Sequence, residues 1–200
     1  PLPGIESRGI FTLRNVNDTD RIKQYMNEHA VKRAVIVGGG FIGLEMAENL
    51  HHAGAEVSVV EMADQVMGPI DYSMAALVHE HLLQKGVKLY LKQAVESFEE
   101  TSQGLAVHFK SGVRLEADLV ILSIGVRAET RLAEQAGLKL GEMKGIYVDE
   151  YLMTSQSDVY AVGDAIEYPH PITGKPWLNF LAGPANRQAR IVADNMGFGN

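Results

Sequence analysis

Residues 34–50 read AVIVGGGFIGLEMAENL: an apolar run, three consecutive glycines, and a fourth glycine inside an amphipathic segment. The β-branched run predicts a buried strand, and the apolar spacing over residues 41–53 predicts a helix. Gly38, Gly40 and Gly43 therefore form the pattern G-x-G-x-x-G at a strand-to-helix junction. In this setting the pattern is typical of a site for the diphosphate of a dinucleotide.

Each glycine has its own physical reason. Gly38 allows a tight turn, Gly40 lets the backbone approach a diphosphate without a Cβ in the way, and Gly43 lets the helix pack closely on the strand. The helix then directs its free N–H groups and the positive end of its dipole at the phosphates. A glycine turn without a ligand is the alternative, and the surrounding sequence decides between the two.

The decisive context is an acid at the end of the next predicted strand, AEVSVVE. This acid is Glu61, 18 residues beyond Gly43, and its carboxylate can accept hydrogen bonds from both hydroxyls of an adenosine ribose. A carboxylate there would repel a 2′-phosphate, and residues 62–83 contain no arginine or lysine to receive one. The sequence therefore predicts NADH as the ligand, with NADPH less favoured; the alternative is that Glu61 merely ends a strand in solvent.

The remaining pattern predicts an α/β fold. A β-α-β-α-β order up to VKLYL favours a Rossmann-like parallel sheet with right-handed crossovers. Three strand-like stretches separated by turn residues follow, ESFEE, GLAVHFK and VRLEADLVILSIG, and predict an appended antiparallel β-meander. Further strands are expected in GIYVDEYLMT and SDVYAVGDA, and a last helix in LAGPANRQARIVADNM. Asp18 is expected to cap an early helix.

Composition excludes several classes of protein. The chain has 200 residues, a net charge of −7 and no cysteine. Disulfides, thiolate metal sites and thiol catalysis within these residues are excluded, and nucleic-acid binding is not favoured. No apolar run is long enough for a membrane span, so a cytoplasmic location is expected. The start at Pro1 without methionine suggests a piece of a longer protein.

Several motifs together resemble one family. VGGGFIGLEMAENL, VVE, LVILSIGVRAET, TSQSDVYAVGDA and LAGPANRQARI occur in the order and spacing of the FAD-dependent pyridine nucleotide-disulfide oxidoreductases. The resemblance covers essentially the whole chain and is strongest to the coenzyme A-disulfide reductases and the NADH oxidases and peroxidases. LAGPANRQ favours the first of these branches.

The resemblance implies the domain organisation of a flavoprotein with two dinucleotide-binding domains. Residues 1–29 would be a linker and a segment of the FAD domain, residues 30–127 the NAD(P)-binding domain, and residues 128–200 the trailing part of the FAD domain. In this family NAD(P)H passes hydride to FAD, and the electrons reach a disulfide, a sulfenic acid or oxygen.

The resemblance also implies roles for individual residues. Gly38–Gly43, with the N–H groups of Phe41 and Ile42, would form the backbone of the diphosphate site, and Glu45 would be the carboxylate near the meeting point of nicotinamide and flavin. The strand end beside the nicotinamide would be Ile124, Gly125 and Val126. Gly163 and Asp164 would contact the flavin ribityl chain, and the helix starting near Ala182 would be aimed at the flavin ring.

Three features of the family are missing from the chain. They are the first G-x-G-x-x-G, which holds the FAD diphosphate, the redox cysteine and the C-terminal dimerisation domain. We therefore expect no catalytic residue and no metal site in this chain, moderate or weak NADH binding, poor retention of FAD, and no turnover. The intact parent is expected to be a homodimer that contains FAD, and the missing half-domain and dimerisation domain would be the partners of this chain.

Other functions remain open at this stage. An NADH oxidase or peroxidase shares every motif present, and rubredoxin- or ferredoxin-type reductases share the Gly-Asp motif. A non-catalytic dinucleotide-binding module would keep the glycines and Glu61. A methyltransferase also uses a glycine turn and an acid, but the meander and VYAVGDA do not fit it. Histidine pairs at 51–52 and 79–81 lack the spacing and partners of a metal site.

Overall fold

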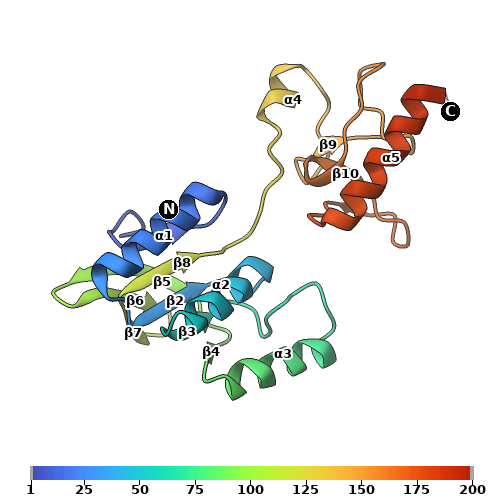
Figure 1. Cartoon of the computed structure of the whole chain (residues 1–200). Coiled ribbons are helices and arrows are strands. Elements are labelled where there is room, and N and C mark those ends of the chain that lie inside the picture. Colours follow the sequence, from blue (N-terminus) through green and yellow to red (C-terminus); the bar gives the residue numbers. More distant parts are fainter. Residues whose placement is uncertain (1, 199–200) are drawn as a thin grey trace. The chain divides into compact units, whose positions relative to one another are not determined.

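The computed structural model describes residues 2–198, and they form two compact units (Figure 1). The first unit extends to Gly125 and the second begins at Val126. Within residues 2–198, no helix has both the length and the apolar character that a membrane crossing requires.

The first unit is built on a five-stranded, all-parallel sheet in the order β1-β8-β2-β3-β4. The strand order reverses at β2, from which the chain winds outward to β3 and β4 on one side and later returns to β8 on the other. The predicted Rossmann-like parallel sheet is thereby confirmed. Its strands are β1 Ile10–Thr12, β2 Arg33–Val37, β3 Glu56–Val60, β4 Lys88–Tyr90 and β8 Leu119–Leu122.

The predicted meander is also present. Strands β5 Val95–Thr101, β6 Gly104–Phe109 and β7 Arg114–Ala117 form a separate antiparallel sheet in that order. Short turns join these strands, as the intervening TSQG and KSG segments predict.

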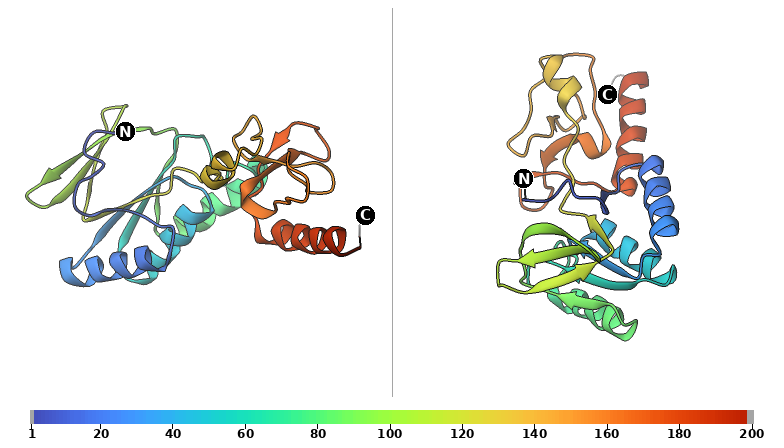
Figure 2. Two further views of the ribbon diagram at one scale, coloured as in Figure 1. Left: turned by 90° about the horizontal axis from the view of Figure 1, so that it is seen from above. Right: turned by 90° about the vertical axis from the view of Figure 1, so that its left-hand side faces the viewer.

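Helices and meander cover opposite faces of the parallel sheet. Ala34 and Ile36 of β2 pack in the core under α1 Val16–His29, α2 Phe41–His52 and α3 Tyr72–Gln84, whereas Val35 and Val37 pack in a second core with the meander. Successive side chains of a strand point to opposite faces, so a strand that is buried on both faces has no polar alternation. The two further views show the helices on one side of the sheet and the meander on the other (Figure 2).

One predicted stretch is divided between the two sheets. VRLEADLVILSIG forms β7 in the meander and β8 in the parallel sheet, and the chain changes direction at Asp118. The Asp118 carboxylate accepts hydrogen bonds from the backbone N–H groups of Lys32 (3.0 Å) and Arg33 (2.8 Å) and from the Arg33 guanidinium (2.6 Å). Burial raises the pKa of Asp118, but these three hydrogen bonds lower it more, so the net pKa lies below the ordinary value.

Part of the chain before residue 30 packs with the parallel sheet. Strand β1 pairs with β8, and Ile22 of α1 packs in the core of the sheet. The compact unit therefore includes chain before residue 30. The cap of α1 differs from the prediction: Asn15 is the N-cap, and Asp18 completes a reciprocal capping box from the third helical position.

The second unit is smaller and contains little regular structure. Its described elements are α4 Arg131–Gln135, β9 Ile146–Tyr147, the 3₁₀ turn η1 Gly163–Ala165, β10 Ile166–Pro169, β11 Pro176–Trp177 and α5 Ala182–Phe198. The last helix is where the sequence predicts it. The strands expected in GIYVDEYLMT and SDVYAVGDA are reduced to β9 and isolated bridges, and the longer strand is β10, just after the Gly-Asp turn.

We predict that Asp118→Ala destabilises the first unit. The change leaves two backbone N–H groups without an acceptor and should lower the free energy of unfolding by about 1–3 kcal/mol at neutral pH. Because the folded-state pKa of Asp118 lies below the ordinary pKa of an aspartate, the stabilising charge is fully present above that ordinary pKa and is lost as the pH falls through the folded-state pKa. The difference between the two proteins should therefore shrink in acid.

Urea unfolding followed by far-UV circular dichroism at pH 7 and pH 3.5 measures both effects. Glu116→Ala is the matched control, because Glu116 forms an exposed ion pair with Arg114 (2.7 Å) and such pairs contribute little. Equal stability losses in the two variants at neutral pH would contradict the role of Asp118.

Candidate dinucleotide-binding site

The site lies at the carboxyl edge of the parallel sheet, where three strands end level. Val37 of β2 is in register with both Val60 of β3 and Leu122 of β8. The next residue on each strand is Gly38, Glu61 and Ser123, so these three residues follow level strand ends. Since the strand order reverses at β2, this edge is the topological switch point at which open α/β sheets bind ligands.

The glycine turn is crowded at three of its four glycines. Gly38 has a φ of +109°, and a Cβ on it would lie 2.3 Å from the carbonyl oxygen of Ser123. A Cβ on Gly43 would lie 2.0 Å from the carbonyl oxygen of Gly38, because α2 begins directly against the turn. A Cβ on Gly39 would lie 2.8 Å from the side chain of Val66. These three positions are glycine for reasons internal to the fold.

Gly40 is different. It has an ordinary φ of −80°, and a Cβ built on it would meet no atom within 4 Å. Gly40 is the N-cap of α2 and supplies no side-chain cap to the helix. The space beside it is therefore open toward the exposed residues Phe41 and Ile42 in the first turn of α2. A cradle of this kind fits a diphosphate, which uses uncapped N–H groups as donors.

The carboxylate of Glu61 is turned toward this turn. One of its oxygens accepts a hydrogen bond from the N–H of Gly39 (2.7 Å) and the other from the N–H of Ala63 (2.8 Å). Each carboxylate oxygen has two lone pairs, so each keeps a free acceptor position for a ribose hydroxyl. The charge is thus held within reach of the turn before any ligand is bound.

The other predicted residues of the nicotinamide half lie partly on this edge. Glu45 is exposed on α2, two residues beyond Gly43. Ile124 and Gly125 follow β8, and Gly125 has a φ of +113° with open space around the position of a Cβ. Val126 is the first residue of the second unit.

The predicted flavin-contacting residues belong to the second unit. Gly163 and Asp164 form η1, and Ala182 is the first residue of α5. The N–H of Gly163 donates to the side-chain oxygen of Gln188 (2.9 Å), which ties the Gly-Asp turn to α5. The Asp164 side chain is exposed and has no hydrogen-bond partner among residues 2–198, so it is free to bind a polar ligand.

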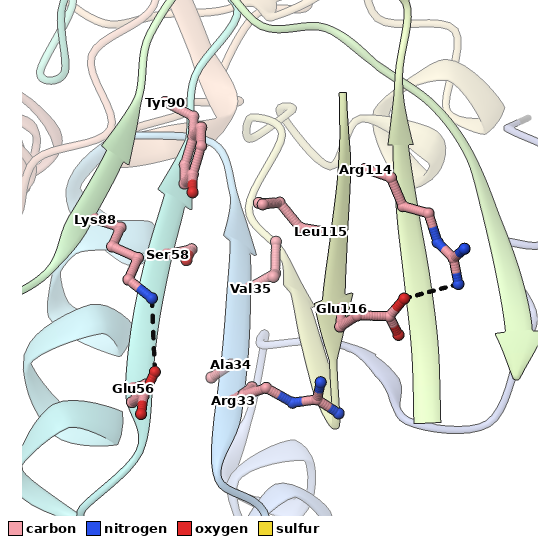
Figure 3. Close-up of a pocket in the computed structure, with 10 residues that line it drawn as sticks. All are labelled: Arg33, Ala34, Val35, Glu56, Ser58, Lys88, Tyr90, Arg114, Leu115 and Glu116. Carbon is pink, nitrogen blue, oxygen red and sulfur yellow. Dashed lines mark ion pairs between the residues drawn. The ribbon is translucent and has the colours of Figure 1, made fainter. Parts of the chain in front are cut away.

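One cavity of the first unit lies away from the glycine turn. It measures about 170 Å³ and is lined where β2, β3 and β4 begin, at the end of the sheet opposite to the glycine turn (Figure 3). Ion pairs between Lys88 and Glu56 (3.6 Å) and between Arg114 and Glu116 (2.7 Å) flank it. Because its charged groups already have partners, this cavity has no chemistry that competes with the glycine turn as the nucleotide site.

Comparison with known proteins assigns the chain to a family. A family model described as pyridine nucleotide-disulphide oxidoreductase matches residues 1–179. The chain belongs to this family. The resemblance seen in its motifs is thereby confirmed, as is the nucleotide-binding α/β fold.

Two curated relatives show how much of a whole oxidoreductase is present. An NADH oxidase of Methanocaldococcus jannaschii is 36% identical over 98% of this chain, and a coenzyme A disulfide reductase of Staphylococcus haemolyticus is 30% identical over 96% of it. These matches cover 44% and 43% of the two relatives. The chain therefore spans less than half the length of either protein.

Solved structures of the family share the fold. Reduced CoADR-RHD of Bacillus anthracis matches 96% of this chain and 34% of its own with a TM-score of 0.90 and 49% identity. The water-forming NADH oxidase of Lactobacillus brevis, bound to NADH, matches 98% of this chain and 43% of its own with a TM-score of 0.87 and 29% identity. A variant engineered as an NADPH oxidase and bound to NADPH matches the same shares with a TM-score of 0.87 and 28% identity.

Two residues that hold parts of the candidate sites are not among those that the sequence predicts. Gly39 is the unassigned position of the fingerprint, yet its N–H donates to Glu61 and its Cα faces Val66. Gln188 holds the Gly-Asp turn from 25 residues further along the chain. A third glycine in succession was the available signal for Gly39, whereas nothing in the sequence connects Gln188 with Gly163.

We predict unequal effects on stability for alanine at Gly43 and at Gly40. Gly43→Ala forces a Cβ against a backbone oxygen and should cost about 1–3 kcal/mol or more of unfolding free energy. Gly40→Ala meets open space at an allowed φ and should change stability by less than about 1 kcal/mol. Thermal unfolding of both variants measures the contrast, and an equal loss in both would show that the close contact at Gly43 is not essential.

Proposed function

We propose that the first unit is the NADH-binding domain of a flavin-dependent pyridine nucleotide-disulfide oxidoreductase, and that the second unit is the trailing part of its FAD domain. The observation that carries this proposal is the contrast within the glycine turn. Packing requires glycine at the three crowded positions. At Gly40 a Cβ would meet no atom of the described residues within 4 Å, and this residue stands at the open N-terminus of α2. A dinucleotide whose diphosphate lies in this open space would explain why residue 40 is glycine.

The preference for NADH rests on Glu61. Its carboxylate is fixed by two backbone N–H groups beside the turn, where a 2′-phosphate would meet a negative charge. The Lactobacillus brevis pair supports this interpretation. The NADPH-binding variant replaces a glycine by alanine and, 18 positions later, an aspartate by alanine, with arginine introduced at the next position. The same spacing separates Gly43 from Glu61 in this chain, and Met62 follows.

The flavin half fits a partial site. Asp164 is an exposed carboxylate after a glycine with a φ of +75°, so it can accept a hydrogen bond from a polyol hydroxyl of FAD. FAD would supply the ring that accepts the hydride, and the parent protein would complete the binding site of that ring. Residues of the first unit would bind and orient NADH, and Asp164 of the second unit would hold the ribityl chain. With no cysteine, this chain performs no thiol step itself.

For the parent protein we favour a coenzyme A-disulfide reductase, with an NADH oxidase or peroxidase as the second candidate. The LAGPANRQ segment and the 49% identity to the Bacillus anthracis CoADR-RHD support the first. The NADH oxidase of Methanocaldococcus jannaschii supports the second. The cytoplasmic location and the homodimer belong to this proposal and rest on the family resemblance.

The central test is titration of the chain with NADH and NADPH. We expect NADH to bind more tightly by about 5- to 150-fold, which corresponds to 1–3 kcal/mol of discrimination. Glu61→Ala should reduce this ratio toward one, and adding Met62→Arg should favour NADPH. Glu61→Gln is the control, because it keeps an acceptor for the Gly39 N–H while removing the charge. Equal binding of both nucleotides by the unmodified chain would contradict the assignment.

Gly40→Ala tests the open cradle directly. Its Cβ would occupy the approach to the diphosphate, so NADH affinity should fall about tenfold or more while the fold is retained. Gly197→Ala is the matched control, because a Cβ on this helical glycine of α5 also meets no atom within 4 Å. Unchanged NADH affinity in Gly40→Ala would contradict the proposed diphosphate site.

A further inference from the structure

The middle of the segment between β3 and α3 is hydrogen-bonded to the glycine turn and packs against it. The N–H of Met67 donates to the carbonyl oxygen of Gly39 (2.8 Å), and the fully buried side chain of Val66 lies against the Cα of Gly39. Glu61 begins this segment and accepts from the N–H of the same glycine. The ribose carboxylate, Val66 and Met67 therefore share one anchor, Gly39.

A histidine on α3 holds the segment from its other side. The N–H of Val66 donates to Nε2 of His79 at 3.1 Å, a side chain-to-backbone contact across 13 residues. His79 is partly buried, and its ring packs edge-on to Tyr72 with centroids 6.1 Å apart. An amide N–H can only donate, so Nε2 of His79 must carry its lone pair and cannot carry a proton.

We propose that His79, unprotonated at Nε2, is a positioning residue. It holds segment 61–67, which includes the proposed ribose ligand Glu61, in the conformation that binds NADH. This inference rests on the proposed function and assigns a role within the same site. Without the acceptor, the Val66 N–H is left buried and unpaired, and the segment can relieve that cost only by moving away from α3. Such a movement also displaces the contact with Gly39 and, with it, the carboxylate of Glu61.

The protonation state of His79 is therefore part of the site. A doubly protonated ring presents an N–H to the Val66 N–H in place of an acceptor, which reverses the interaction from attraction to repulsion. The segment and α3 also carry other titratable groups. Segment 61–71 contributes Glu61, Asp64 and Asp71, and α3 contributes Tyr72, Glu80 and His81. A variant that removes only the His79 titration separates its effect from theirs.

The test compares three variants in NADH titrations of the whole chain at pH 8 and pH 6. At pH 8, His79→Leu should weaken NADH binding by about three- to tenfold, from the loss of one hydrogen bond. His79→Gln, which keeps an acceptor oxygen, should restore affinity to within about twofold. His81→Leu is the matched control, because His81 is an exposed histidine of the same helix with no hydrogen bond to the segment within residues 2–198.

The pH arm distinguishes positioning from simple support of the fold. Between pH 8 and pH 6 the unmodified chain should lose more NADH affinity than His79→Gln, whose side chain does not titrate. Amide hydrogen exchange at Val66 should accelerate in His79→Leu while exchange in β2 stays slow, which also shows that this variant is folded.

The outcomes separate the two proposals. If the unmodified chain does not bind NADH, the proposed function fails. If it binds NADH, but His79→Leu binds as tightly and shares the pH dependence of the unmodified chain, then His79 has no positioning role. Loss of affinity in both His79→Leu and His79→Gln with equal pH profiles would likewise overturn the inference.

Discussion

The contact between Gly43 and the carbonyl oxygen of Gly38 is the constraint on which the site depends. A helix whose first turn lies this close to the strand it follows can accept a Cβ at that point only if the backbone shifts. The closeness fixes where α2 begins and directs its uncapped end along the carboxyl edge of the sheet. The level ends of β2, β3 and β8 then bring the acid of one strand and the open turn of another to the same edge.

Much of the first unit follows from local sequence. The change from an apolar strand to helical spacing at the glycines locates β2 and α2 within a residue, because both elements obey strong periodicities. Periodicity did not locate the break at Asp118, since β7 and β8 are both strand-like and differ only in which sheet they join. That choice depends on the hydrogen bonds from Lys32 and Arg33, which are 85 or more residues away in sequence.

The candidate site divides in the same way. Gly38, Gly40, Gly43 and Glu61 could be predicted because a fingerprint with fixed spacing encodes their roles. The contacts of His79 with Val66 and of Gln188 with Gly163 could not be predicted, since they join distant segments and carry no sequence pattern. In the second unit the sequence located the last helix. The strands that it predicted before the Gly-Asp turn are mostly absent, because very short strands depend on their pairing partners.

The unequal size of the two cores has a consequence for how the chain unfolds. In the part of the second unit that the structure describes, the apolar core consists of Val148, Leu152, Ile166 and Val192, against two larger clusters in the first. Cooperative melting of the whole chain is then not expected, and no single midpoint describes it. The sole tryptophan, Trp177, lies in β11 of the second unit, so its fluorescence reports on the unfolding of that unit and not on that of the first.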